Sequence, residues 1–140
     1  MDGRNLISAM ALLFLFSCGG QHRVAETAQA VLTTITDTGQ PAYRMVIAYC
    51  ETEQWKIVHD GDRTVPQKKA GVAKVRTKCH AIYDVFEQAA KLQPVARDLI
   101  DAAKTAGEAA QALEKVEEIR ELLASAHSKF KALREQRGEP

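Results

Sequence analysis

Three cysteines, Cys18, Cys50 and Cys79, are the residues of this 140-residue chain with the widest chemical range. A cysteine can hold a metal, act as a nucleophile, pair in a disulfide or carry a lipid. The spacing argues against a metal site, because the chain has no Cys-x-x-Cys or His-x-x-x-His pair. We therefore expect no bound metal and no cofactor.

The remaining chemistry-bearing residues do not form a recognised catalytic arrangement. The four histidines are scattered, and none lies beside a serine or an acid in a known pattern. The segment Asp60-Gly61-Asp62 begins like a calcium loop, but Thr64 and Gly71 stand where two further ligands are required. A turn is the better interpretation of this segment, and we expect no catalytic residue in the chain.

The N-terminal residues have the composition of an export signal. A short polar start with one arginine precedes the run Leu6–Phe16, in which ten of eleven residues are hydrophobic. This run is too short to cross a bilayer of about 30 Å as a helix, but it fits the apolar core of a signal peptide. The chain has no run of 18 or more apolar residues, so no ordinary transmembrane helix is predicted.

The segment Leu15-Phe16-Ser17-Cys18, followed by two glycines, resembles the lipobox of bacterial lipoproteins. The resemblance covers residues 5–20 only. It implies removal of a signal peptide (1–17), a diacylglyceryl group on Cys18 as membrane anchor, and an acyl group on its new amine. Gly19 after the cysteine favours the outer membrane over the inner. Two alternatives stay open: an ordinary secretory signal, and an uncleaved apolar helix in a cytoplasmic protein.

Cys50 and Cys79 remain once Cys18 carries the lipid. Export places this pair in an oxidising compartment, where two thiols commonly form a disulfide. The closed loop of about 30 residues would stabilise the fold by about 3.6 kcal/mol in the chain-entropy model. The alternative is that each cysteine is a separate small buried side chain.

Helical periodicity extends over the chain after residue 23, and no strand pattern competes with it. We predict a tether over 18–23 and one helical domain over 24–140, because turn residues or prolines interrupt the periodicity at three places. The expected helices are about 24–37, 41–58, 67–92 and 95–134. The fold class is all-α, a small antiparallel bundle or hairpin with a long C-terminal helical arm.

The two cysteines of the predicted disulfide lie on apolar helix faces. Cys50 shares a face with Val46 and Ile57, and Cys79 belongs to a heptad stripe typical of coiled coils. An antiparallel hairpin would bring the two faces together, although the helix lengths leave an offset of about 8 Å. Either the loop between the helices 41–58 and 67–92 or a start of the latter helix nearer Lys69 than Pro66 must absorb that offset.

The overall charge bears on one class of partner, nucleic acid, and we expect no such partner. With 19 Lys and Arg against 18 Asp and Glu, the net charge is +1, so bulk charge gives no reason to expect nucleic-acid binding. One segment is nevertheless strongly basic and contains no acid: Arg63, Lys68, Lys69, Lys74, Arg76 and Lys78. It is either a solvated helix face, favoured by the lack of interleaved aromatics, or a patch for an anionic partner.

Together these features predict a lipid-anchored protein of the bacterial envelope that acts as a structural or interaction module and not as an enzyme. The expected partner surface, or surface for self-association, is the helical arm Val95–Leu133, because two short N-terminal helices could not cover its apolar stripe. The alternatives are a periplasmic enzyme with an unrecognised site and a cytoplasmic helical adaptor.

Overall fold

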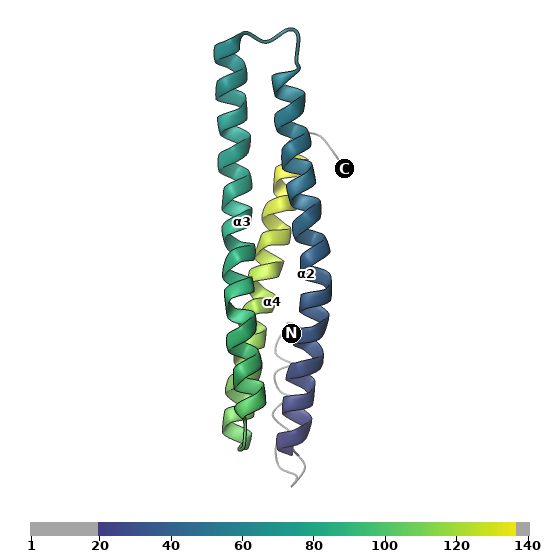
Figure 1. Cartoon of the computed structure of the whole chain (residues 1–140), viewed down its shortest axis with the longest axis vertical. Helices are drawn as coiled ribbons and strands as arrows, with labels where there is room; N and C mark the ends of the chain where they lie inside the picture. Colours follow the sequence, from purple (N-terminus) through teal and green to yellow (C-terminus); the bar gives the residue numbers. More distant parts are fainter. Residues whose placement is uncertain (1–19, 137–140) are drawn as a thin grey trace, which may run out of the picture.

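The computed structural model describes residues 20–136, which form three long helices: α2 (Gly20–Val58), α3 (Val65–Ala102) and α4 (Ala106–Glu135). Consecutive helices run antiparallel and lie side by side as a narrow rod (Figure 1). No strand occurs within residues 20–136. The prediction of an all-α bundle is therefore confirmed.

Helix α2 is continuous where the sequence predicted two helices, 24–37 and 41–58. It passes through Gly39 and Pro41 without a break and begins at Gly20, so residues 20–23 are helical and do not form a tether. Pro41 removes one backbone donor, but buried residues on both sides, such as Ile35 and Val46, pack into the bundle and keep the helix axis continuous. Local threonines also bond within the helix, donating to carbonyls four residues earlier at 2.8–3.0 Å: Thr33, Thr34, Thr36 and Thr38.

Helix α3 shows the same outcome at its internal proline. The predicted break between 92 and 95 is wrong, because α3 runs through Pro94 to Ala102. Ala89 and Ala96 are both fully buried on either side of the proline, and this packing outweighs the lost backbone hydrogen bond. The chain turns later, at residues 103–105, so the predicted helix 95–134 is divided between α3 and α4.

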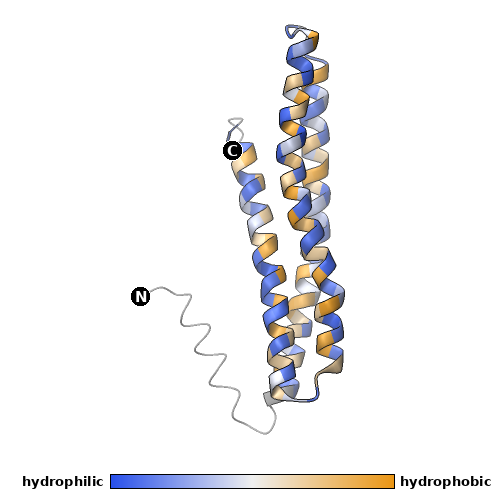
Figure 2. Ribbon diagram, turned by 90° about the vertical axis from the view of Figure 1, so that its left-hand side faces the viewer, coloured by the Kyte–Doolittle hydropathy of each residue, from blue (hydrophilic) through white to orange (hydrophobic). Residues whose placement is uncertain are grey.

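Two hydrophobic clusters run along the bundle axis, and every helix contributes to both. Figure 2 shows hydrophobic and hydrophilic residues interspersed along each helix, as expected of amphipathic helices. Helix α4 is the shortest of the three and packs against both others. It is therefore a member of the bundle and not a projecting arm, and its apolar stripe is buried: Ala109, Ala112, Val116, Ile119, Ala126, Phe130 and Leu133.

A disulfide joins α2 to α3. Cys50 and Cys79 are bonded with their Cα atoms 6.3 Å apart, and both side chains are buried in the hydrophobic cluster that also contains Val46 and Phe130. The prediction of this bond is confirmed. The alternative that the expected helix 67–92 starts later, near Lys69, is wrong, since α3 begins at Val65. Instead α3 extends further than α2 at this end, and the loop 59–64 covers the difference (Figure 1).

The turn between α3 and α4 ends in a capping box. The backbone N–H of Glu108 donates to the Thr105 hydroxyl at 3.2 Å, and the Glu108 carboxylate accepts from the backbone N–H groups of Lys104 and Thr105 at 2.7 and 3.0 Å. These hydrogen bonds satisfy donors at the helix start and hold the pKa of Glu108 below its ordinary value.

We expect the substitution Thr105→Ala to lower the free energy of unfolding by about 1 kcal/mol, because it removes an N-cap acceptor.

The contribution of Glu108 to stability depends on pH, because its pKa in the folded protein is lowered. Its stabilisation is therefore complete above the ordinary glutamate pKa of about 4.3 and is lost as the pH falls through the folded pKa. Urea unfolding of the wild type and Glu108→Gln at a series of pH values measures this. The difference between them should shrink on acidification, and a constant difference would contradict the assignment.

Candidate binding site at the hairpin end

The end of the bundle formed by α2 and α3 extends beyond α4 (Figure 1). Helix α4 ends beside Lys78, whose ammonium donates to the Gln136 side-chain carbonyl. Lys78 lies thirteen residues after the start of α3 at Val65, so about 20 Å of α3 projects past α4. We call this projecting part, residues 53–78 of α2, α3 and their loop, the hairpin end.

The loop of the hairpin end is closed by hydrogen bonds of its own. The Asp60 carboxylate accepts from the backbone N–H of Asp62 at 3.0 Å and pairs with Arg63 at 2.8 Å. Thr64 is the N-cap of α3, and its backbone N–H donates to the Gln67 side-chain carbonyl at 2.8 Å. The segment Asp60-Gly61-Asp62 is thus a turn. Within residues 20–136, no cluster of three or more His, Cys, Asp or Glu side chains could hold a metal ion.

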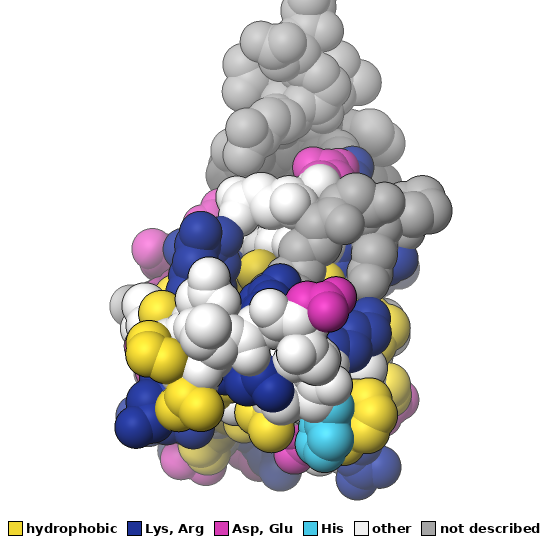
Figure 3. All heavy atoms as spheres, turned by 90° about the horizontal axis from the view of Figure 1, so that it is seen from above, with side chains coloured by type: hydrophobic (Ala, Val, Ile, Leu, Met, Phe, Trp, Pro, Cys, Tyr) yellow, Lys and Arg dark blue, Asp and Glu magenta, His cyan; other side chains and the backbone are white. Residues whose placement is uncertain are grey.

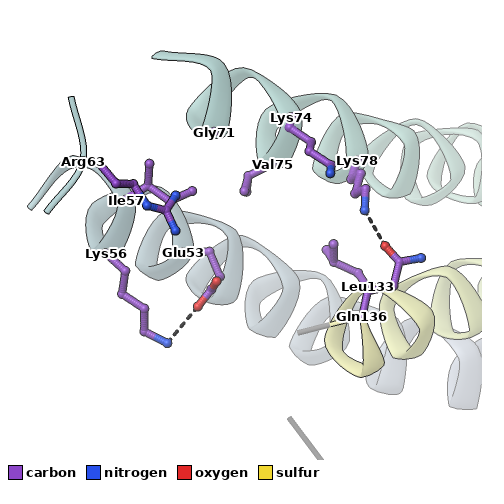
Figure 4. Close-up of a pocket in the computed structure, with 10 residues that line it drawn as sticks. All are labelled: Glu53, Lys56, Ile57, Arg63, Gly71, Lys74, Val75, Lys78, Leu133 and Gln136. Carbon is purple, nitrogen blue, oxygen red and sulfur yellow. Dashed lines mark hydrogen bonds and ion pairs between the residues drawn. The ribbon is translucent and has the colours of Figure 1, made fainter. Parts of the chain in front are cut away.

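A cavity of about 680 Å³ opens between the hairpin end and the C-terminus of α4. Figure 4 shows that its walls come from all three helices and from the loop. Four of its lining side chains are cationic, and one is a carboxylate. The lining residues are Glu53, Lys56, Ile57, Arg63, Gly71, Lys74, Val75, Lys78, Leu133 and Gln136.

Glu53 is the one buried charged side chain among those that the structure describes, with 2% of its surface exposed. Its carboxylate accepts from the Lys56 ammonium at 2.8 Å, and the lysine itself is about half exposed. A carboxylate taken out of water is costly unless cations compensate it. Glu53 therefore supplies negative charge among the cationic residues that line the cavity and holds the Lys56 ammonium.

Gly71 allows α3 to approach α2 closely at the cavity. A Cβ atom at this position would lie 3.1 Å from Ile57 Cγ2 and 3.3 Å from Arg63 Nη1. Both distances are shorter than ordinary van der Waals contact, so a larger residue would have to displace one of these groups. The glycine thus leaves room for the Arg63 guanidinium to lie against α3.

The structure divides the predicted basic patch into two groups. Three of its members line the cavity: Arg63, Lys74 and Lys78. The other three lie outside the cavity lining on the same projecting segment: Lys68, Lys69 and Arg76. Within the described part of the chain, Arg63 is the patch member that forms an ion pair, with Asp60.

Exposed apolar side chains accompany these cations. Trp55, Val58 and Val65 have exposed fractions of 61%, 50% and 66%. Trp55 stacks on the His59 ring with centroids 4.2 Å apart, and the His59 Nδ1 atom lies 2.9 Å from the Trp55 carbonyl oxygen. Seen along the axis, hydrophobic side chains and lysine or arginine side chains are interspersed on this end (Figure 3).

Sequence reasoning missed the part that α2 contributes to the site. The basic run contains no aromatic residue, but the hairpin brings Trp55 to the same end of the rod. A signal existed for Glu53, because it lies on the apolar stripe of Val46, Cys50 and Ile57 at helical spacing. Trp55 lies off that stripe, so the same helical spacing would have predicted that its side chain faces solvent.

Cys18 and the predicted signal peptide lie outside the described residues. Within residues 20–136, no helix is both long and apolar enough to span a membrane. No protein-family model, curated protein or solved structure matches the chain.

Proposed function

We propose that the protein is a lipid-anchored lipoprotein of the bacterial envelope, held in the outer membrane, that acts as a rod-shaped interaction module and not as a catalyst. The observation that carries this proposal is the position of the lipobox-like cysteine relative to the rod. Cys18 precedes the first residue of α2, Gly20, by two positions, and α2 leads from there to the hairpin end. The 39 residues of α2 correspond to about 58 Å, so an anchor at Cys18 would present the hairpin end at that distance.

The disulfide supports an exported location. Structural disulfides persist in oxidising compartments and are rare where thiols are kept reduced. The Cys50–Cys79 bond is buried between two helices in the position expected of a structural crosslink. An exported chain would form it without consuming Cys18, which leaves that thiol for lipid.

The cavity composition favours binding over catalysis. Among its lining residues in the described part of the chain, the acid is Glu53, which is already paired with Lys56, and no histidine, serine or cysteine accompanies it. Such a set can attract an anion but offers no hydroxyl or thiol nucleophile with a base beside it. We therefore place the partner surface at the hairpin end and not along residues 95–133, whose apolar stripe in α4 is buried in the bundle.

Metabolic labelling with radioactive palmitate tests the anchor. We expect label in the wild type and none in Cys18→Ala, because the thiol is the acceptor of the diacylglyceryl group. Ser17→Ala is the matched control, since it keeps a small residue before the cysteine and should remain labelled. A wild-type protein that is cleaved but unlabelled would indicate an ordinary secretory signal. An unlabelled protein of full length would indicate the cytoplasmic adaptor.

A further inference from the structure

We propose that the hairpin end binds the surface of an anionic phospholipid bilayer through its basic and exposed apolar side chains. This contact is separate from the proposed acyl anchor, since the hairpin end includes the C-terminus of α2, whereas Cys18 precedes the first residue of α2 in the sequence. It adds a binding activity to the proposed function and does not depend on lipidation of Cys18.

Charge at the hairpin end favours an anionic ligand. From Glu53 to Lys78 the chain has seven bases and three acids. Two of those acids are engaged in ion pairs, Glu53 with Lys56 and Asp60 with Arg63. Four of the bases form no ion pair with another residue of the described chain: Lys68, Lys69, Lys74 and Arg76. Their attraction acts within a Debye length of about 8 Å at physiological salt, so it operates once the end is close to a charged surface.

The apolar side chains at this end favour a bilayer over a soluble anion. Trp55, Val58 and Val65 each expose half or more of their surface, and they lie at or beside the loop that joins α2 to α3. Tryptophan prefers the interface between lipid headgroups and acyl chains, where its ring is apolar and its N–H stays hydrated. Stacking on His59 limits the conformations of the ring before contact. A phosphate polymer would satisfy the cations and leave both valines exposed.

The shape of the molecule fits a flat partner. The hairpin end projects past α4, so it can approach a surface without α4 touching it first (Figure 1). Hydrophobic and basic side chains are interspersed across this end (Figure 3). Lysine can keep its ammonium among headgroups while its alkyl chain lies along apolar surface. The arrangement therefore allows the valines and Trp55 to enter the interface while the lysines meet phosphate groups.

Fluorescence of Trp55 tests the proposal directly, because it is the single tryptophan of the chain. The full-length protein is mixed with vesicles of phosphatidylcholine alone or of phosphatidylcholine with phosphatidylglycerol. We expect a blue shift of Trp55 emission, and quenching by lipids with brominated acyl chains, with the anionic vesicles only. The apolar N-terminus can attach the protein to both kinds of vesicle, but Trp55 lies about 52 Å along α2 from Gly20. Its emission therefore reports the hairpin end.

A matched pair of charge-reversal variants identifies the surface. Lys68→Glu/Lys69→Glu should weaken the anionic-vesicle response about tenfold. Lys91→Glu/Arg97→Glu makes the same charge change at exposed positions toward the other end of α3 and should leave the response within about twofold. Circular dichroism checks that both variants are folded. Val58→Ser/Val65→Ser should reduce the quenching by brominated lipid while leaving the secondary structure unchanged.

Four results would overturn the proposal. Trp55 emission could stay unchanged with anionic vesicles, or shift equally with neutral ones. Both charge-reversal variants could lose the response to the same extent. Soluble polyphosphate could shift the emission where vesicles do not, which would assign the end to a phosphate polymer. Each result is independent of palmitate labelling, so failure here is distinguishable from failure of the anchor at Cys18.

Discussion

Loss of the Cys50–Cys79 disulfide is expected to lower the free energy of unfolding by about 3.6 kcal/mol. The bond closes a loop with a sequence separation of 29 residues, and without it the unfolded chain gains the corresponding conformational freedom. Both side chains are essentially fully buried, so replacing them with alanine also leaves unfilled volume between α2 and α3. A loss of this size is a large share of the stability of an ordinary domain, about 5–15 kcal/mol.

Urea unfolding of Cys50→Ala/Cys79→Ala, compared with the wild type, measures the effect. The control is Cys18→Ala, which keeps the disulfide and should unfold as the wild type does. A reducing agent should destabilise the wild type and leave the double variant unchanged. A difference below about 1 kcal/mol between the double variant and the wild type would show that the crosslink contributes little, against the entropy argument.

Replacement of the proline inside α2 is expected to stabilise the protein. Pro41 lacks the backbone donor that a helix interior needs and crowds the carbonyl four residues earlier, at a cost of about 3 kcal/mol. Part of that gain is offset because alanine also frees the unfolded chain. We therefore expect Pro41→Ala to raise the free energy of unfolding by about 2 kcal/mol, and Pro94→Ala in α3 to do the same. Both prolines are exposed, so no core contact is lost.

Pro66 provides the matched control for these variants. It lies in the first turn of α3, where a proline is tolerated because the donor it lacks would have no helical partner. Pro66→Ala should therefore leave stability unchanged or lower it slightly. Thermal and urea unfolding of the three variants give the comparison. A stability gain for Pro66→Ala equal to that of Pro41→Ala would contradict the helix-interior explanation.

These prolines also explain which parts of the fold the sequence could predict. The apolar faces that bring Cys50 and Cys79 together follow from local spacing, and the structure contains that bond. The breaks expected at Pro41 and Pro94 did not occur, because packing along the whole bundle outweighs a single missing hydrogen bond. Such packing depends on residues distant in sequence and cannot be read from a local pattern.

The true end of α3 did carry a local signal. Thr105 and Glu108 have the spacing of a capping box, which marks a helix start. The alanine-rich sequence on both sides favours helix so strongly that the pattern predicted one continuous helix across residues 103–105. The basic residues of the candidate site were likewise visible as a run. Their association with Glu53 and Trp55 required knowledge of the hairpin, because those residues precede the loop that reverses the chain.

The disulfide near the hairpin end has a topological consequence. Because it joins α2 to α3 on either side of the loop 59–64, the hairpin end is a covalently closed ring. A protease that cut one peptide bond in the exposed loop would leave both pieces attached to each other. The lysines that follow the loop would then stay beside α2 after such a cut. A single cut in the loop would therefore not separate the basic patch from the rest of the molecule.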